Sequence, residues 1–312
     1  MIGIVGFLSI ALAGATPAAG APKVFQDCAS CPRMIEVPAG TYSIGSPEIE
    51  PGRYPNERPM KQETVRPFAI GETEITRGQF AKFVAETNHE MARGCYTPGK
   101  LDDLLSDLDP KASWRDPGFE QTDDHPVVCI SWNDAVTYAR WLSEKTGHKY
   151  RLPTEASWEV AERGGTATAF FWGRSADEGC AYHNGGDLSL GEKWPEWAER
   201  TEEARKGGEP NSVLVQCRDG HAFTSAARSF LPNPFGLFDM TGNVWEWVLD
   251  CGDNQGRVGD SPLEASPACE RRRTRGGSWD DWPVDLRSAV RKRLEPSFRR
   301  SDTGFRLVRE LI

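Results

Sequence analysis

The stretch GLFDMTGNVWEWVLD, residues 236–250, combines two tryptophans with a glycine-containing turn that Asp239 and Glu246 flank. The whole chain shares this character, with 31 Gly, 22 Pro and 11 Trp among its 312 residues. Gly and Pro interrupt regular elements, and Trp buries a large area in few residues. The composition therefore predicts a loop-rich fold that is held by aromatic clusters instead of long helices.

The same turn offers the kind of oxygen ligands that calcium prefers. Calcium takes six to eight oxygens from carboxylates, amides and backbone carbonyls. The carboxylates of Asp239 and Glu246 lie on either side of a turn whose carbonyl groups can point inward. A solvated acidic loop is the alternative interpretation of this pattern.

Three segments have the periodicity and the end signals of helices. Each begins at a side chain that caps helix N-termini well, and two of them end at glycine. The three predicted helices run over residues 76–88, 131–147 and 151–165, with N-caps at Thr76, Ser131 and Thr154. No long helical pattern follows Gly165. Upstream, the alternation of Ile35 and Val37 with Tyr42 and Ile44 across the Pro-Ala-Gly turn suggests a hairpin.

The amino-terminal residues 1–21 are apolar and small and contain small-x-small cleavage patterns, which is typical of a secretory signal peptide. A short membrane anchor is the alternative, but the apolar run is short and rich in Gly. We expect a signal peptide over 1–21, a tether over 22–33 and a single domain over 34–312. The mature protein is then expected to be periplasmic or secreted and free of the membrane.

Charge and cysteine content restrict the partners and the compartment. The net charge is −9, which repels polyanions, so we expect no nucleic-acid partner. Eight cysteines follow the signal, and an even number in an exported chain predicts disulfides. Cys28 and Cys31 form a CxxC motif in a Pro-flanked segment that lacks a second zinc half-site. A local disulfide is therefore favoured over a redox or zinc site.

Four stretches, in this order and spacing, give the chain a family resemblance. They are MIEVPAGTYSIGS, HPVVCISWNDAVTYARWLSEKTGHKYRLPTEASWEVAERGG, NPFGLFDMTGNVWEWVLD and RGGSWDDWPVDLRSAVR with the later DTGFRLVR. The chain resembles the formylglycine-generating enzyme (sulfatase-modifying factor) family over nearly all of its mature length. The resemblance implies a single irregular α+β domain with little regular secondary structure, related to C-type lectins and holding structural calcium.

The family's enzyme oxidises a sulfatase cysteine to formylglycine with molecular oxygen and copper(I) on two active-site cysteines. Thiolates suit copper(I) because both are soft. By resemblance, the first cysteine position falls near Asp281, and no cysteine follows Cys269 in this sequence. We therefore expect no copper cofactor and no formylglycine formation by the known route.

Three further side chains match the family's pocket. By resemblance, Ser278 corresponds to an active-site serine, Trp245 to a tryptophan that lines the oxygen pocket, and Arg291 to a pocket arginine. Each also has a structural explanation, which we favour. Ser278 would form backbone hydrogen bonds, Trp245 would pack in the core, and Arg291 would pair with carboxylates. Asp281 completes the set of pocket candidates.

The resemblance also implies calcium ligands and disulfide partners. One ligand set is Asp239 and Glu246 with the backbone oxygens of Gly242 and Val244. A second set is Asn184 and Asp219 with the backbone oxygens of Gly185 and His221. The resemblance places Cys180 near Cys217, which predicts one disulfide. Cys251 and Cys269 would close a short loop, and Cys95 and Cys129 remain as the third pair.

Two functions remain open. The first is a peptide- or protein-binding accessory, maturation or immunity factor. The second is a metal-dependent oxidase of a peptide or peptide-derived substrate, since the family also has branches linked to pyoverdine maturation and ergothioneine synthesis. The ergothioneine branch is disfavoured because it needs an additional helical domain and iron-ligating histidines. Asp280, Asp281 and Asp285, beside Arg287 and Arg291, could hold a hard cation, although an ion-paired surface loop is the favoured interpretation.

Overall fold

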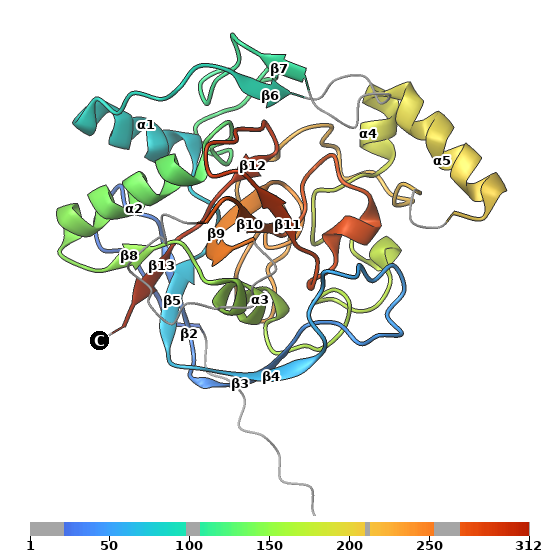
Figure 1. The fold of residues 1–312 in the computed structure, drawn as a ribbon, viewed down its shortest axis with the longest axis horizontal. Coiled ribbons are helices and arrows are strands. Elements are labelled where there is room, and N and C mark those ends of the chain that lie inside the picture. The colour runs from blue at the N-terminus through green and yellow to red at the C-terminus, as the bar shows by residue number, and fades with distance from the viewer. Residues whose placement is uncertain (1–21, 98–106, 210–212, 253–268, 312) are drawn as a thin grey trace, which may run out of the picture.

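The computed structural model describes residues 22–97, 107–209, 213–252 and 269–311. Helices and short strands alternate with long connecting loops, as Figure 1 shows, and this confirms the predicted α+β fold. The predicted signal peptide lies outside the described residues.

Five strands form an antiparallel sheet in which the amino- and carboxyl-terminal parts of the chain meet. In sheet order they are β1 (Val24–Phe25), β2 (Met34–Val37), β5 (Phe68–Gly71), β13 (Val308–Glu310) and β8 (Tyr150–Arg151). The segment predicted as a tether therefore contributes the edge strand β1. Its Cys31 side chain is 1% exposed and belongs to the core.

A second sheet of four strands carries the residues of the candidate site. Its order is β11 (Lys292–Leu294), β10 (Arg272–Arg275), β9 (Trp245–Cys251) and β12 (Thr303–Gly304). The pairing of β12 with β9 is parallel, whereas β10 runs antiparallel to both of its neighbours. Two-stranded sheets join β3 (Gly40–Ile44) to β4 (Lys61–Val65) and β6 (Cys95–Thr97) to β7 (Asp107–Asp109).

The predicted hairpin between β2 and β3 is wrong, although both strands exist. β2 is almost entirely buried and pairs with β1 and β5, whereas β3 is largely accessible and pairs with β4. Because β2 is buried on both faces, its backbone N–H and C=O groups need hydrogen-bond partners on neighbouring strands of a larger sheet. After the Pro-Ala-Gly turn the chain therefore leaves this sheet, and β3 pairs in a different one.

The three predicted helices form close to the expected residues and with the expected caps. α1 (Arg77–Thr87) and α2 (Trp132–Thr146) begin with capping boxes at Thr76 and Ser131, and α3 (Glu155–Arg163) begins at Thr154. Gly147 and Gly164 end α2 and α3 in the left-handed conformation.

The prediction that no long helix follows Gly165 is wrong. α4 (Leu188–Lys193) and α5 (Pro195–Gly207) form a pair, drawn in yellow in Figure 1, on the opposite side of the central strands from α1 and α2. Only Thr201 and Ala204 of α5 are buried. A helix that buries so little apolar surface has no hydrophobic stripe in its sequence.

Aromatic side chains hold the core together, as the composition predicted. One cluster packs α1 and α2 against the central strands and includes Phe80, Phe83, Tyr138, Trp247 and Phe305. A second cluster packs α3 between the two main sheets. The ring of Phe80 stacks on that of Tyr138 with centroids 5.9 Å apart.

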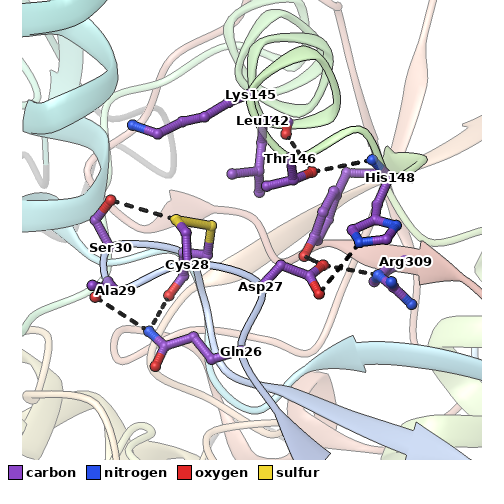
Figure 2. The surroundings of a disulfide bond; sticks show 12 residues. Gln26, Asp27, Cys28, Ala29, Ser30, Leu142, Lys145, Thr146, His148 and Arg309 are labelled. Atoms are coloured by element: carbon purple, nitrogen blue, oxygen red, sulfur yellow. Dashed lines mark hydrogen bonds and ion pairs between the residues drawn. A yellow bond between two sulfur atoms is a disulfide. The ribbon is translucent and has the colours of Figure 1, made fainter.

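All eight cysteines form disulfides, and the pairings confirm the prediction. The bonds join Cys28–Cys31, Cys95–Cys129, Cys180–Cys217 and Cys251–Cys269. Figure 2 shows the first of these, a local bridge whose loop is closed by the amide of Gln26 donating to the Cys31 carbonyl at 2.6 Å. Next to it, the Asp27 carboxylate binds Tyr150 and Arg309, which fixes the loop to β8 and β13.

Candidate functional site

The segment between β10 and β11 begins with a turn that only glycine accommodates. Gly276 and Gly277 have φ of +102° and +76°, in the left-handed region that side chains rarely adopt. A Cβ on Gly277 would lie 2.5 Å from the Cδ2 atom of Leu286. Ser278 follows directly and is fully buried.

Asp281 is the centre of a buried hydrogen-bond group. Its Oδ2 accepts from Trp245 Nε1 and from Ser278 Oγ, each at 2.5 Å. Its Oδ1 accepts from Lys292 Nζ at 2.7 Å, and the same ammonium lies 4.3 Å from the centroid of a Trp245 ring. The structure thus brings three of the four predicted pocket residues together, and it adds Lys292.

A second aspartate pair extends this group. Asp280 Oδ1 lies 2.7 Å from Ser278 Oγ, and Arg300 binds Asp280 and Asp302 at 2.9 and 2.8 Å. Oxygen atoms of Asp280, Asp281 and Asp302 all lie within 4.8 Å of one another, and all three side chains are buried. Two cations, Lys292 and Arg300, already lie against these three carboxylates.

The two neighbouring aspartates titrate in opposite directions. Burial raises the pKa of Asp280 to about 6, and the nearby charges of Asp302 and Asp281 add to that effect while Arg300 opposes it. Burial also acts to raise the pKa of Asp281, but the charge and hydrogen bond of Lys292 and the bond from Ser278 outweigh it, so the pKa of Asp281 is lowered. Asp280 is therefore the side chain of the pair that holds a proton more readily.

Arg291, the fourth predicted pocket residue, points elsewhere. Its guanidinium pairs with Glu155 at the start of α3 and donates to the Asn56 carbonyl at 3.3 Å. Together with Arg58 and Arg275, it borders a small pocket of about 10 Å³. That is room for one water molecule at most, so Arg291 acts here as part of a buried ion network.

The predicted acidic cluster of Asp280, Asp281 and Asp285 is divided in the structure. Asp285 accepts from the hydroxyl of Tyr54 at 3.1 Å, and its pKa is raised to about 6 by burial and by the charge of Asp281. Arg287 turns away to Glu50 and Glu57, with N–O distances of 2.7 and 2.6 Å.

The first predicted calcium set is available only in part. Asp239 has one buried oxygen that finds no hydrogen-bond partner among the described residues, which suits a cation. Both oxygens of Glu246, however, accept from Arg306 Nε at 2.8 Å, and Trp158 Nε1 also donates to Glu246 at 2.8 Å. The assignment of Asp239, Gly242, Val244 and Glu246 as calcium ligands stays a prediction.

The second predicted calcium set has open oxygens on both of its side-chain ligands. Asn184 Oδ1 and Asp219 Oδ2 are buried and have no hydrogen-bond partner within the part of the chain that the structure describes. The Asp219 amide donates to Asp187 at 2.6 Å, and burial together with the Asp187 charge raises the pKa of Asp219 to about 7. Oxygen donors of this kind fit calcium, and Gly185 and His221 would add backbone carbonyls; this site also stays a prediction.

A surface depression of about 630 Å³ adjoins the buried group through Trp279. Phe119 and Phe223 stack in its wall with ring centroids 4.6 Å apart, and both contact the Trp279 ring edge-on. Lys193 and Trp194 complete the side formed by α4. Sequence reasoning missed Phe119 and Phe223, because nothing in the local pattern around them indicates that they meet.

Comparison with known proteins places this architecture in a family. The formylglycine-generating enzyme of Streptomyces coelicolor is 31% identical over 328 aligned positions, covering 95% of this chain and 96% of that protein. The mouse protein named inactive C-alpha-formylglycine-generating enzyme 2 is 28% identical and covers 91% of this chain and 88% of its own length. The structure of PvdO from Pseudomonas aeruginosa superposes with a TM-score of 0.72 at 33% identity, covering 94% of this chain and all of that one.

None of the helices in the part of the chain that the structure describes has the length and apolar character of a membrane span.

The family model of the sulfatase-modifying factor enzyme 1-like domain matches residues 20–311 of this chain. The chain therefore belongs to the sulfatase-modifying factor family, which includes the formylglycine-generating enzymes.

Proposed function

We propose that this protein is an exported member of the family that binds a peptide or protein as an accessory, maturation or immunity factor, without forming formylglycine by the copper route. The observation that carries the proposal is that all eight cysteines are paired in disulfides. Copper(I) prefers thiolates, and a cysteine in a disulfide offers none.

The environment of Asp281 supports the same proposal. Its carboxylate is a hard donor and already accepts hydrogen bonds from Trp245, Ser278 and Lys292. A soft metal gains little from such a group. The depression walled by Phe119 and Phe223 offers an apolar surface on which a partner's side chain could rest.

Four disulfides support export, because such bonds persist in oxidising compartments. The similarity to both an active and a named inactive formylglycine-generating enzyme does not by itself decide between activity and binding. The local chemistry of residues 276–292 is what favours binding.

A metal-dependent oxidase is the second candidate, and the aspartate group of Asp280, Asp281 and Asp302 favours it. A divalent cation there would have to displace Lys292 or Arg300, which now neutralise two of the three charges. That requirement ranks the oxidase below the binding function.

The test is a side-by-side assay with the Streptomyces coelicolor enzyme as positive control. A sulfatase-type cysteine peptide is incubated with each protein, copper and a reductant that leaves the disulfides intact, and the products are analysed by mass spectrometry. We expect conversion by the control enzyme and none by this protein. An aldehyde product from this protein would refute the proposal, and one copper or iron ion per purified chain would favour the oxidase.

A further inference from the structure

Alternate residues of two neighbouring strands are all arginines. β10 and β11 lie side by side (Figure 1) and pair antiparallel, with Arg273 directly opposite Arg293. Because alternate side chains of a strand leave on the same face, these arginines share one face of the pair. This arginine face consists of Arg271, Arg273 and Arg275 from β10 and the residue before it, with Arg291 and Arg293 from β11 and the residue before it.

At its inner end the arginine face has too few carboxylates. Glu155, the first residue of α3, lies among several guanidinium groups, and one carboxylate neutralises only one of them. Its oxygens are within 3.6 Å of guanidinium nitrogens of Arg58, Arg273, Arg275 and Arg291. Glu159, one helical turn later, is divided between Arg275 and Arg163. Positive charge therefore exceeds negative charge among these groups.

At its outer end the arginine face is accessible and has no counter-ion. Arg271 and Arg293 are exposed, and neither forms an ion pair with any residue that the structure describes. A Cβ on Gly252 would lie 2.9 Å from that of Arg293 and 3.2 Å from that of Arg271, so both side chains leave the sheet next to each other. Arg58, on the loop before β4, adds a guanidinium whose side chain is 31% exposed.

This crowding of like charges is unfavourable for the protein alone. Arginines directly opposite each other, as Arg273 and Arg293 are, destabilise a strand pair. Burial, followed by the charges of Arg58 and Arg275, lowers the pKa of Arg273 to about 10, and the charge of Asp250 opposes this only in part. An anionic partner at the outer end would relieve the repulsion.

We propose that the outer end of the arginine face binds an acidic, extended peptide segment of a partner protein. This deepens the proposed function, on which it rests for the peptide nature of the partner. Guanidinium groups pair with carboxylates through two parallel hydrogen bonds. Same-face arginines on a strand are about 6.6 Å apart, and alternate side chains of an extended peptide have the same spacing. A segment with a carboxylate at every second residue therefore matches the face.

A peptide fits this face better than a membrane surface does. The side chain of Arg273, between the exposed arginines, is 10% exposed, so a narrow chain reaches it whereas a flat layer of headgroups contacts protruding groups. The net charge of −9 repels anions on average. Because the screening length at physiological salt is about 8 Å, a short segment on the face experiences mainly the local arginines.

The experiment measures binding of a short fluorescein-labelled peptide that alternates Glu and Thr, by fluorescence anisotropy. The same peptide with Gln in place of Glu is the probe control. We expect the wild-type protein to bind the Glu peptide about tenfold more tightly than the Gln peptide, with an affinity that falls as salt is added. A wild-type protein that binds neither peptide, or both equally, overturns the proposal.

The double variant Arg271→Gln with Arg293→Gln tests the location. It removes two exposed charges and should weaken binding of the Glu peptide about tenfold. Arg66→Gln with Arg174→Gln is the matched control, since both residues are exposed and the net charge changes equally. This control should keep the wild-type affinity. Equal affinities of the two double variants would refute the assignment to the arginine face.

Three checks make the result unambiguous. Circular dichroism tests whether the double variant folds, and Arg293→Gln alone carries the test if it does not. Phosphatidylglycerol vesicles that bind more tightly than the Glu peptide, and lose binding in the same variant, would assign the face to a membrane and overturn the proposal. The formylglycine assay is independent of both: an aldehyde product refutes the proposed function, whereas failure to bind the Glu peptide refutes only the acidic partner.

Discussion

Ser278 has one hydroxyl hydrogen and two carboxylates within reach, Asp280 at 2.7 Å and Asp281 at 2.5 Å. A hydroxyl donates only one hydrogen bond, so one of these two contacts needs a proton on the carboxyl. Asp280 is the group that keeps it, since its pKa is raised to about 6 whereas the pKa of Asp281 is lowered. The serine–aspartate group therefore changes its charge near pH 6.

This arrangement predicts how stability depends on pH. Asp280 has a folded-state pKa of about 6, above its ordinary value of 3.8, so the folded state binds the proton more tightly. The stability that the proton on Asp280 contributes is fully present below about pH 4, and it is lost as the pH rises through 6. Asp280→Asn mimics the protonated side chain, so the variant should escape this loss, which is on the order of 2 kcal/mol in the wild-type free energy of unfolding. Denaturant unfolding between pH 5 and 8 measures the effect.

Asp281→Asn is the matched comparison, because its pKa shift has the opposite sign. The bond from Lys292 stabilises the charged form, so this variant should be less stable than wild type near pH 7, and the difference should shrink as acid protonates the wild-type carboxyl. Parallel pH profiles for the two variants would contradict the assignment of the proton to Asp280.

The sequence pointed to part of this group and missed the rest. Trp245, Ser278 and Asp281 were candidates because a local resemblance covers each of them. Lys292, Arg300 and Asp302 complete the group, but they come from β11 and from the loop that leads to β12. Only the pairing of β9 with β10 and β12 brings these segments together, and no local pattern encodes that pairing.

Among the elements, helices with end signals and a buried face could be predicted, while those without a buried face could not. α2 has Ser131 as N-cap, Asp134 at the capping-box position and an apolar stripe through Leu142. α5 begins at Pro195 and is capped by Gly208, but only Thr201 and Ala204 are buried and its exposed faces carry charges. The wrong β2–β3 hairpin has a related cause, since two adjacent alternating segments do not reveal which sheet each one joins.

The cap of α2 allows a test at this scale. Ser131 Oγ accepts from the Asp134 amide at 3.2 Å and donates to the Asp134 carboxylate. Ser131→Ala removes both bonds and should lower the free energy of unfolding by about 1–2 kcal/mol. Chemical denaturation with circular dichroism measures this change.

Thr137→Ala, in the same helix, is the control. Its hydroxyl donates to the Asn133 carbonyl on an exposed face, so alanine there should be neutral or slightly stabilising. Equal losses in the Ser131 and Thr137 variants would show that the capping box contributes nothing specific.

At the scale of the whole molecule, disulfides join segments that the sheets leave apart. Cys95–Cys129 connects β6 to the segment before α2, and Cys180–Cys217 connects the loop before α4 to the loop after α5. The segment between Cys180 and Cys217 contains α4 and α5, of which little is buried. In the chain-entropy model, a covalent bond that closes a long segment stabilises the fold by restricting the unfolded chain.

The protein should therefore depend on its long-range bridges more than on its local one. In the chain-entropy model, the 34-residue separation of Cys95 and Cys129 corresponds to about 4 kcal/mol, and the 3-residue separation of Cys28 and Cys31 to about 2 kcal/mol. The double variant Cys95→Ala with Cys129→Ala should lower the melting temperature clearly more than Cys28→Ala with Cys31→Ala. Calorimetry compares the two variants, after mass spectrometry of the wild type shows that no cysteine is alkylated without reductant. Equal shifts would mean that loop length does not set the contribution of these bonds, and a thiol that reacts in the native protein would remove the basis for excluding copper(I).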